Sequence, residues 1–90
     1  MALLCTPEFE MQEVHPENGE VFTLQELQAF VGRYIEIVGT YKNWYALGNV
    51  DGIRLGLPLN ARASNLIDRL LFGDILFLTH EEMEKGEDDE

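Results

Sequence analysis

The stretch at residues 23–38, TLQELQAFVGRYIEIV, combines start, stop and periodicity signals for a helix that is followed by a strand. Thr23 suits the N-cap position, where its hydroxyl accepts from an unpaired backbone N–H, and Glu26 three residues later completes a capping box. Apolar side chains then repeat at helical spacing until Gly32, which suits the end of a helix because glycine adopts unusual backbone angles at little cost. The β-branched and aromatic residues at 34–38 alternate as in a strand. We therefore expect a helix packed on a strand at the centre of the fold.

Further strands and a second helix are expected around this unit. Asn60 suits the N-cap of a helix over about residues 61–71, whose apolar side chains form one stripe. The resulting order is β-α-β-β-β-α-β, and its simplest solution is a single two-layer α+β domain, a mostly antiparallel sheet with two helices on one face. The other expected strands lie at residues 9–14, 44–48, 53–57 and 75–78. The first three alternate between the two faces of a strand, whereas the one at 75–78 is apolar on both faces.

Both ends of the chain are expected to lie outside this domain. Residues 1–8 are expected to form a flexible leader, and residues 80–90 a disordered acidic tail, because the tail offers no apolar period. The folded domain then spans residues 9–79. No apolar run approaches the ~20 residues that a membrane-spanning helix needs. We therefore expect no membrane contact and a location in the cytoplasm.

The formal net charge of −11 is concentrated at the two ends of the chain. The first 30 residues hold six glutamates and no lysine or arginine, and residues 77–90 hold seven acids against Lys85. Acidic ends of this kind keep a protein soluble through self-repulsion. The alternative is an acidic surface that docks a basic partner or mimics nucleic acid. The candidate residues for such a surface are Glu10, Glu13, Glu17 and Glu20.

The residues that could carry out catalysis are few and widely separated in the sequence. Ser64 is the only serine, Cys5 lies in the expected leader, and His15 and His80 flank the expected domain. A nucleophile, a base and an orienting group must meet in one place, and nothing in this spacing brings them together. The same residues lack the spacing of a zinc site, and the glycines do not form a phosphate-binding loop. We expect no enzymatic activity, no metal and no cofactor.

Aromatic residues gather shortly after the central stretch. Tyr41, Trp44 and Tyr45, with Lys42 and Arg54 nearby, could stack bases on a sheet, as in proteins that bind single strands. The acidic ends would repel a phosphate backbone. Tyrosine and tryptophan equally suit sheet packing or a protein interface. All three interpretations stay open, with direct nucleic-acid binding the least favoured.

Three blocks of the sequence resemble a small domain family of unknown function that occurs mainly in phage and mobile-element proteins. The blocks are LQELQAFVGRYIEIV at 24–38, DGIRLGLPLNARAS at 51–64 and GDILF at 73–77. Members of that family tend to have a helix with Val-Gly-Gly, then Tyr-Ile-Glu, a Leu-Pro-x-Asn-x-x-Ala-Thr block and a closing Gly-Asp-Val/Ile-Leu strand. Here Arg33 replaces the second glycine and Ser64 the threonine. The resemblance implies a phage or mobile-element origin, and it supplies no catalytic residues.

The leading hypothesis is a non-catalytic, phage-type protein-binding module that engages a host protein. Its purpose would be inhibition of a host defence system, in the manner of an anti-CRISPR or anti-restriction protein. The partner would be a nucleic-acid-binding subunit of that system, met by the acidic glutamates or by the aromatic residues. The alternative is a structural or housekeeping phage protein that self-associates as a homodimer through its sheet edge. A single-stranded nucleic-acid binder is the third hypothesis.

Overall fold

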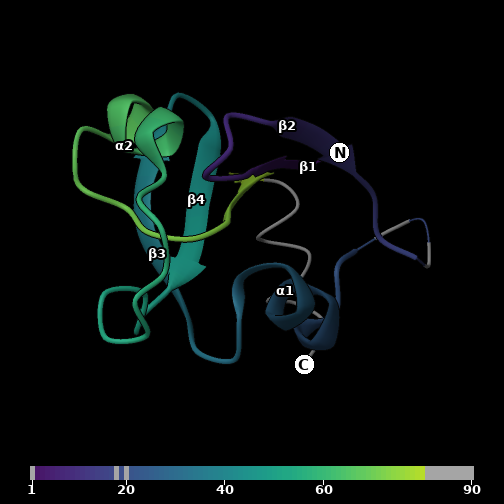
Figure 1. Ribbon diagram of the computed structural model, residues 1–90. Helices are drawn as coiled ribbons and strands as arrows, with labels where there is room; N and C mark the ends of the chain where they lie inside the picture. Colours follow the sequence, from purple (N-terminus) through teal and green to yellow (C-terminus); the bar gives the residue numbers. More distant parts are fainter. Residues whose placement is uncertain (1, 18, 20, 81–90) are drawn as a thin grey trace.

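The computed structural model describes residues 2–17, 19 and 21–80, which form an antiparallel sheet with two helices (Figure 1). The expected acidic tail, apart from His80, lies outside these residues. The strands lie in the order β2-β1-β5-β4-β3, and neighbouring strands are antiparallel. The expected α+β class is therefore confirmed. In chain order the elements are β1 (Ala2–Cys5), β2 (Met11–Val14), α1 (Leu24–Val31), β3 (Ile35–Tyr41), β4 (Trp44–Asn49), α2 (Ala61–Ile67) and β5 (Ile75–Thr79).

The helix α1 begins and ends where its local signals predict. The Thr23 hydroxyl accepts from the backbone N–H of Glu26 at 3.2 Å, and the Glu26 carboxylate accepts from the backbone N–H of Thr23 at 2.9 Å, which completes the capping box. Gly32 ends the helix with a φ of 113°. The helix α2 begins at its predicted cap, Asn60, but ends at Ile67 rather than near residue 71. Within the described part of the chain, neither helix has the length and apolar character needed to cross a membrane.

The flexible leader expected at residues 1–8 is wrong, because Ala2–Cys5 forms strand β1 inside the sheet. β1 pairs with β2 on one side and with β5 on the other. The side chains of Ala2 and Cys5 are fully buried. Four apolar residues carry no period of their own, so only pairing with β5, near the other end of the chain, makes this segment a strand.

The strand expected at residues 53–57 is also wrong. The backbone there forms successive turns, in which the Leu55 N–H donates to the Asp51 carbonyl and the Gly56 N–H donates to the Ile53 carbonyl. Gly56 has a φ of 70°, in the left-handed region. Ile53 and Leu55 are 76% and 58% exposed, so the apolar alternation does not mark a buried face. The observed order of elements is β-β-α-β-β-α-β.

The two helices pack on opposite faces of the sheet, rather than on the one face expected (Figure 1). Leu76 of β5 belongs to the core cluster that contacts Phe30 of α1, whereas its neighbour Phe77 belongs to the cluster that contacts Ile67 of α2. Successive strand residues point to opposite faces, and β1 and β5 are apolar on both. Each face therefore needs a cover, and the sheet lies between two helical layers. We call the two sides the α1 face and the α2 face.

The strand registers place the connections at two ends of the sheet. The tight turn between β3 and β4 lies at one end together with the end of β5, since Tyr41 pairs with Trp44 and Trp44 pairs with Thr79. At the opposite end of the sheet, β1 and β4 end and β5 begins, so the connections that leave β1 and β4 and the one that enters β5 lie there. We call this opposite end the loop end; it consists of residues 6–10, 50–60 and 72–74.

Candidate functional site

Three of the four glutamates predicted to form an acidic surface lie in the described residues, on β2 or just beside it. Glu10 is exposed in the turn between β1 and β2. Glu13 is exposed on β2, where its carboxylate oxygen lies 2.8 Å from Nε2 of His15. Glu17 is exposed beyond β2, and Glu20 lies outside the described residues.

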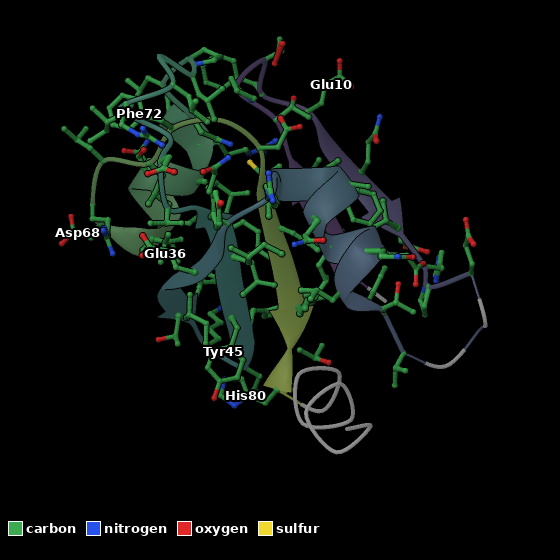
Figure 2. All side chains as sticks on the ribbon, turned by 90° about the horizontal axis from the view of Figure 1, so that it is seen from below. Glu10, Glu36, Tyr45, Asp68, Phe72 and His80 are labelled. Atoms are coloured by element: carbon green, nitrogen blue, oxygen red, sulfur yellow. The ribbon has the colours of Figure 1, made fainter. Side chains whose placement is uncertain are left out.

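The predicted aromatic surface is divided between the two faces of the sheet. Trp44 packs against the core cluster on the α2 face, and Tyr41, its partner in β3, shares that face. Tyr45 lies on the α1 face, where its ring and the ring of His80 have centroids 4.2 Å apart. Figure 2 shows Tyr45 and His80 at the end of the molecule opposite to Phe72 of the loop end. The structure therefore does not bring the three aromatic residues together.

Buried Asn60 holds the connections of the loop end in place. Its side-chain amide donates to the carbonyls of Cys5 at 2.8 Å and Gly73 at 2.9 Å. Its Oδ1 accepts from the backbone N–H of Ala63 at 3.1 Å and from the thiol of Cys5 at 3.5 Å. Asn60 thus joins the end of β1, the start of β5 and the start of α2. With its donors and acceptor all engaged, its role is structural.

A hollow of about 300 Å³ opens at the loop end, beside the end of α1. Two carboxylates, those of Glu8 and Asp74, line it together with apolar side chains that include Phe30, Leu57 and Pro58. We call this feature the acidic hollow. It combines negative charge with apolar walls, which is the composition of a recognition site rather than of a purely solvated surface.

The backbone that carries Asp74 is fixed by its neighbour Gly73. Gly73 has a φ of 83° and donates its N–H to the Pro58 carbonyl at 2.7 Å. The left-handed backbone angle favours glycine, and a Cβ at this position would lie 2.7 Å from Cδ1 of Leu57, so the end of that side chain would have to shift. The carbonyl of Gly73 accepts from Asn60. Asp74 is therefore placed on the wall of the hollow by contacts that do not involve its own carboxylate.

Glu8 is presented by the turn between β1 and β2. The Thr6 N–H donates to the Glu10 carbonyl at 2.9 Å, and the Phe9 N–H donates to the Thr6 carbonyl at 3.1 Å. Arg62 of α2 donates to the Phe9 carbonyl at 3.1 Å and so attaches the turn to the helix. Glu8 remains exposed within this fixed turn.

The end of α1 forms the remaining wall of the acidic hollow. Gly32 lies so close to Asn49 of β4 that a Cβ would overlap the Asn49 amide nitrogen. The glycine therefore allows the helix end to approach the loop end. The last carbonyls of a helix carry a partial negative charge, and the last turn of α1 has no basic side chain to offset it. This wall adds to the negative potential of the two carboxylates.

The pKa of Asp74 responds to this environment. Partial burial raises the pKa of its carboxyl above the ordinary value, and the charge of Glu8 raises it further. Among the described residues, neither Glu8 nor Asp74 forms an ion pair, and no lysine, arginine or histidine lines the hollow. The hollow therefore holds two negative charges without a compensating cation from the described part of the chain.

A second hollow, of about 80 Å³, lies on the α2 face beyond Asn49, and we call it the apolar hollow. Val50, Ile53 and Leu70 line it and are 49%, 76% and 70% exposed. Glu36, Asn49 and Arg69 also border it, and the Arg69 guanidinium donates to the Val38 carbonyl at 2.9 Å. Exposed apolar side chains that gather in this way are typical of interaction surfaces.

Two of the residues considered for catalysis, Ser64 and Cys5, have structural partners. The Ser64 hydroxyl donates to the Asn60 carbonyl at 2.6 Å and accepts from the Leu71 N–H at 2.9 Å. The Cys5 thiol is buried, which raises its pKa and disfavours the reactive thiolate. In the described ranges, no group of three or more histidine, cysteine, aspartate or glutamate side chains is placed to hold a metal ion.

Sequence reasoning missed the residues that line both hollows. Asp74 follows a glycine at a predicted turn, and the sequence around it indicates only that turn and no binding role. Glu8 lies in the segment expected to be a flexible leader. Nothing in the sequence pairs residue 8 with residue 74, because β1 and β5 bring them together only in the folded sheet. Ile53 was assigned to a buried strand face that does not exist.

Comparison with known families gives one finding. The family described as "Domain of unknown function (DUF3846)" matches residues 1–89. The match therefore includes both ends of the sheet and both hollows. No curated protein and no solved structure matches the chain.

Proposed function

The chain belongs to the DUF3846 family, a domain of unknown function, and from that premise we propose that it is a non-catalytic protein-binding module. It engages its partner through the loop end. The family description names no activity, so the proposal rests on the surface of the molecule and on the chemistry of its side chains.

The observation that carries the proposal is the gathering of Val50, Ile53 and Leu70 around the apolar hollow. All three lie on connections rather than in the sheet, and their exposed side chains are not part of the core. Covering them with a partner would remove apolar surface from water, which favours association through the hydrophobic effect. Their position next to the acidic hollow offers the partner an apolar contact beside a charged one, as in the centre and rim of protein interfaces.

The absence of catalysis is part of the proposal. Ser64 and Cys5 are engaged in the hydrogen bonds around Asn60, and these bonds shape the loop end. A nucleophile needs a free, activated group beside a base, and neither residue has that arrangement. The acidic hollow likewise offers two carboxylates without a neighbouring nucleophile.

A phage origin, a host protein as the partner and a location in the host cytoplasm belong to the same proposal. They rest on the resemblance of residues 24–38, 51–64 and 73–77 to phage-type domains. Inhibition of a host defence system, anti-CRISPR or anti-restriction, is the purpose we propose, because an acidic protein suits a basic, nucleic-acid-binding subunit.

The two alternative functions have less support. Self-association through a sheet edge would use β2 or β3, yet β2 spans four residues and β3 carries a register shift between Ile37 and Gly39. Short and irregular edge strands discourage pairing with another chain. Binding of single-stranded nucleic acid would use Trp44 and Tyr45 together, and these rings lie on opposite faces of the sheet.

Affinity capture from bacterial host lysates, read by mass spectrometry, tests the proposal. Leu70→Asp places a charge in the apolar hollow at an exposed position, where it should leave folding intact. Leu24→Asp is the matched control, because Leu24 is 64% exposed but lies at the start of α1, and an acid there suits the helix N-terminus.

We expect a host protein that the wild type and Leu24→Asp retain and that Leu70→Asp loses. Equal retention of the host protein by wild type and both variants would show that the interface does not include Leu70 at the loop end. If several hosts yield no retained protein, the binding function itself is contradicted. Light scattering would then test for self-association.

A further inference from the structure

We infer that the acidic hollow receives the guanidinium group of an arginine side chain from the protein partner. The inference rests on the proposed function, because it names the chemistry by which the loop end recognises that partner. It concerns a surface distinct from the apolar hollow, although Asn49 lines both.

The size and walls of the acidic hollow suit one long side chain. Its volume of about 300 Å³ is at the small end of the range for ligand sites, too small for a large cofactor. Leu57 and Pro58 offer apolar surface to the aliphatic stem of the arginine, as long cationic side chains pack their stems while the charged group stays near polar atoms. Phe30 lines the hollow from the end of α1, and aromatic side chains attract cations.

The charge distribution selects a cation. Partial burial is the main cause of the raised pKa of Asp74, the charge of Glu8 raises that pKa further, and the end of α1 adds a partial negative charge. Arg62 donates to the Phe9 carbonyl and does not line the hollow. A cation from the partner would replace repulsion with attraction to both carboxylates. A phosphate group, by contrast, would add a third negative charge.

Arginine fits this arrangement better than the other cations. Its planar fork has five N–H donors, so it can reach two carboxylates that come from different connections, whereas a lysine ammonium is a strongly hydrated point charge. A calcium ion takes six to eight oxygen ligands, and the hollow offers only the two carboxylates as charged oxygen donors among its described walls. Arginine is also enriched in the cores of protein interfaces.

Amide NMR of the ¹⁵N-labelled protein, titrated with acetyl-Gly-Arg-Gly-amide, tests the inference. We expect saturable shifts that are confined to the backbone amides of Glu8, Gly32, Gly73 and Asp74, with a Kd near millimolar, as expected of a single side chain. The peptide with citrulline in place of arginine keeps the shape and loses the charge, and it should produce no saturable shift. Equal shifts with citrulline, or shifts spread over all acidic segments without saturation, would overturn the inference.

Charge-neutralising variants separate the hollow from the overall charge of the protein. Glu8→Gln and Asp74→Asn should each weaken binding of the arginine peptide about tenfold, the scale of one hydrogen bond between charged groups. Glu36→Gln removes the same single charge from the border of the apolar hollow and should change the affinity by less than about twofold. If Glu36→Gln weakens binding as much as the other two, the peptide responds only to net charge and the inference fails.

A measurement on the wild type guards against variants that fold poorly. The carboxyl carbon of Asp74, followed by NMR through an acid titration, reports its pKa directly. Saturation with the arginine peptide should lower that pKa, because the guanidinium favours the ionised carboxylate, and the citrulline peptide should leave it unchanged. An unchanged pKa with the arginine peptide would contradict the inference whatever the variants do.

The failure of this inference differs from the failure of the proposed function. A host protein that is captured by wild type, lost with Leu70→Asp and retained with Glu8→Gln would support the binding function and contradict the arginine site. Arginine-peptide binding at the hollow without any captured host protein would support the site and contradict the function.

Discussion

Replacement of Asn60 by alanine removes the side chain that joins three elements of the fold. The change leaves the carbonyls of Cys5 and Gly73 without their Asn60 donors and the backbone N–H of Ala63 without its cap. Asn60 is fully buried, so water does not reach these groups while the fold stays closed. We therefore expect a large loss of stability from the substitution of one neutral polar residue.

The magnitude follows from the three interactions. Each buried carbonyl left without a donor costs about 1–2 kcal/mol, and loss of an N-cap costs about 1 kcal/mol. The free energy of unfolding should therefore fall by about 3–5 kcal/mol. A domain of this length has a total of about 5–13 kcal/mol, so the variant should lie close to the limit of folding, and its Tm should fall by at least about 12 °C.

Urea denaturation, followed by the fluorescence of Trp44, measures this loss. Trp44 packs against the core cluster on the α2 face and should report unfolding of that cluster. Asn65→Ala is the matched control, because Asn65 is an exposed asparagine on α2, and its replacement should change stability by less than about 0.5 kcal/mol. A loss below about 1 kcal/mol for Asn60→Ala would refute the reasoning.

Asn60→Asp separates the cap from the two crosslinks. An aspartate can still accept from the Ala63 N–H but cannot donate to the carbonyls of Cys5 and Gly73 when it is ionised. Its burial should raise the folded pKa above the unfolded one, so the destabilisation should grow as the pH rises through that interval. Denaturation at pH 4 and pH 7 should therefore show the larger loss at pH 7. An equal loss at both pH values would mean that the carboxyl stays solvated.

Three further predictions concern other parts of the fold. Asp74→Asn should raise the Tm at pH 7 but not at pH 3. The pKa of Asp74 is raised in the folded protein, so its ionisation opposes folding, and this penalty disappears as the pH falls below the ordinary aspartate pKa. A lower Tm of the variant at pH 7 would contradict this prediction. Thr23→Ala should lower the free energy of unfolding by about 1 kcal/mol. Hydrogen bonds from the backbone N–H groups of Thr23 and residue 17 lower the pKa of Glu26, so Glu26 should contribute stability that is lost as the pH falls through its folded pKa. The Tm advantage of wild type over Glu26→Gln should therefore vanish in acid. Gly73→Ala should destabilise the fold by about 1 kcal/mol more than Gly56→Ala. Both glycines have left-handed backbones, but only the methyl group added at residue 73 would meet another side chain. Equal losses of Tm in thermal denaturation would count against that contact.

Local signals predicted the parts of the fold that depend on neighbours in the sequence. Thr23 and Glu26 satisfy the first backbone donors of α1 within one turn, and Gly32 ends the helix where the pattern indicates. Asn60 caps α2 as predicted. These interactions involve residues three or four apart, so the sequence contains all the information that they need.

Patterns that depend on distant partners led to wrong predictions. The alternation at residues 53–57 is that of a strand, but no described strand pairs with it, and Gly56, with its left-handed backbone, allows a turn instead. The apolar residues at 2–5 show no period, yet pairing with β5 buries them on both faces. A strand exists only when another strand supplies its hydrogen bonds, and that partner is not visible in the segment itself.

The sequence by itself determined the α+β class, the caps of both helices and the acidic character of the chain. Only the tertiary structure decided that Glu8 and Asp74 share one hollow, that the three predicted aromatic residues are divided between two faces, and that Val50, Ile53 and Leu70 line one surface. The physical reason is the range of the interactions: capping and periodicity act over one or two turns of the chain, whereas a surface site is assembled by strand pairing between segments that the sequence keeps far apart.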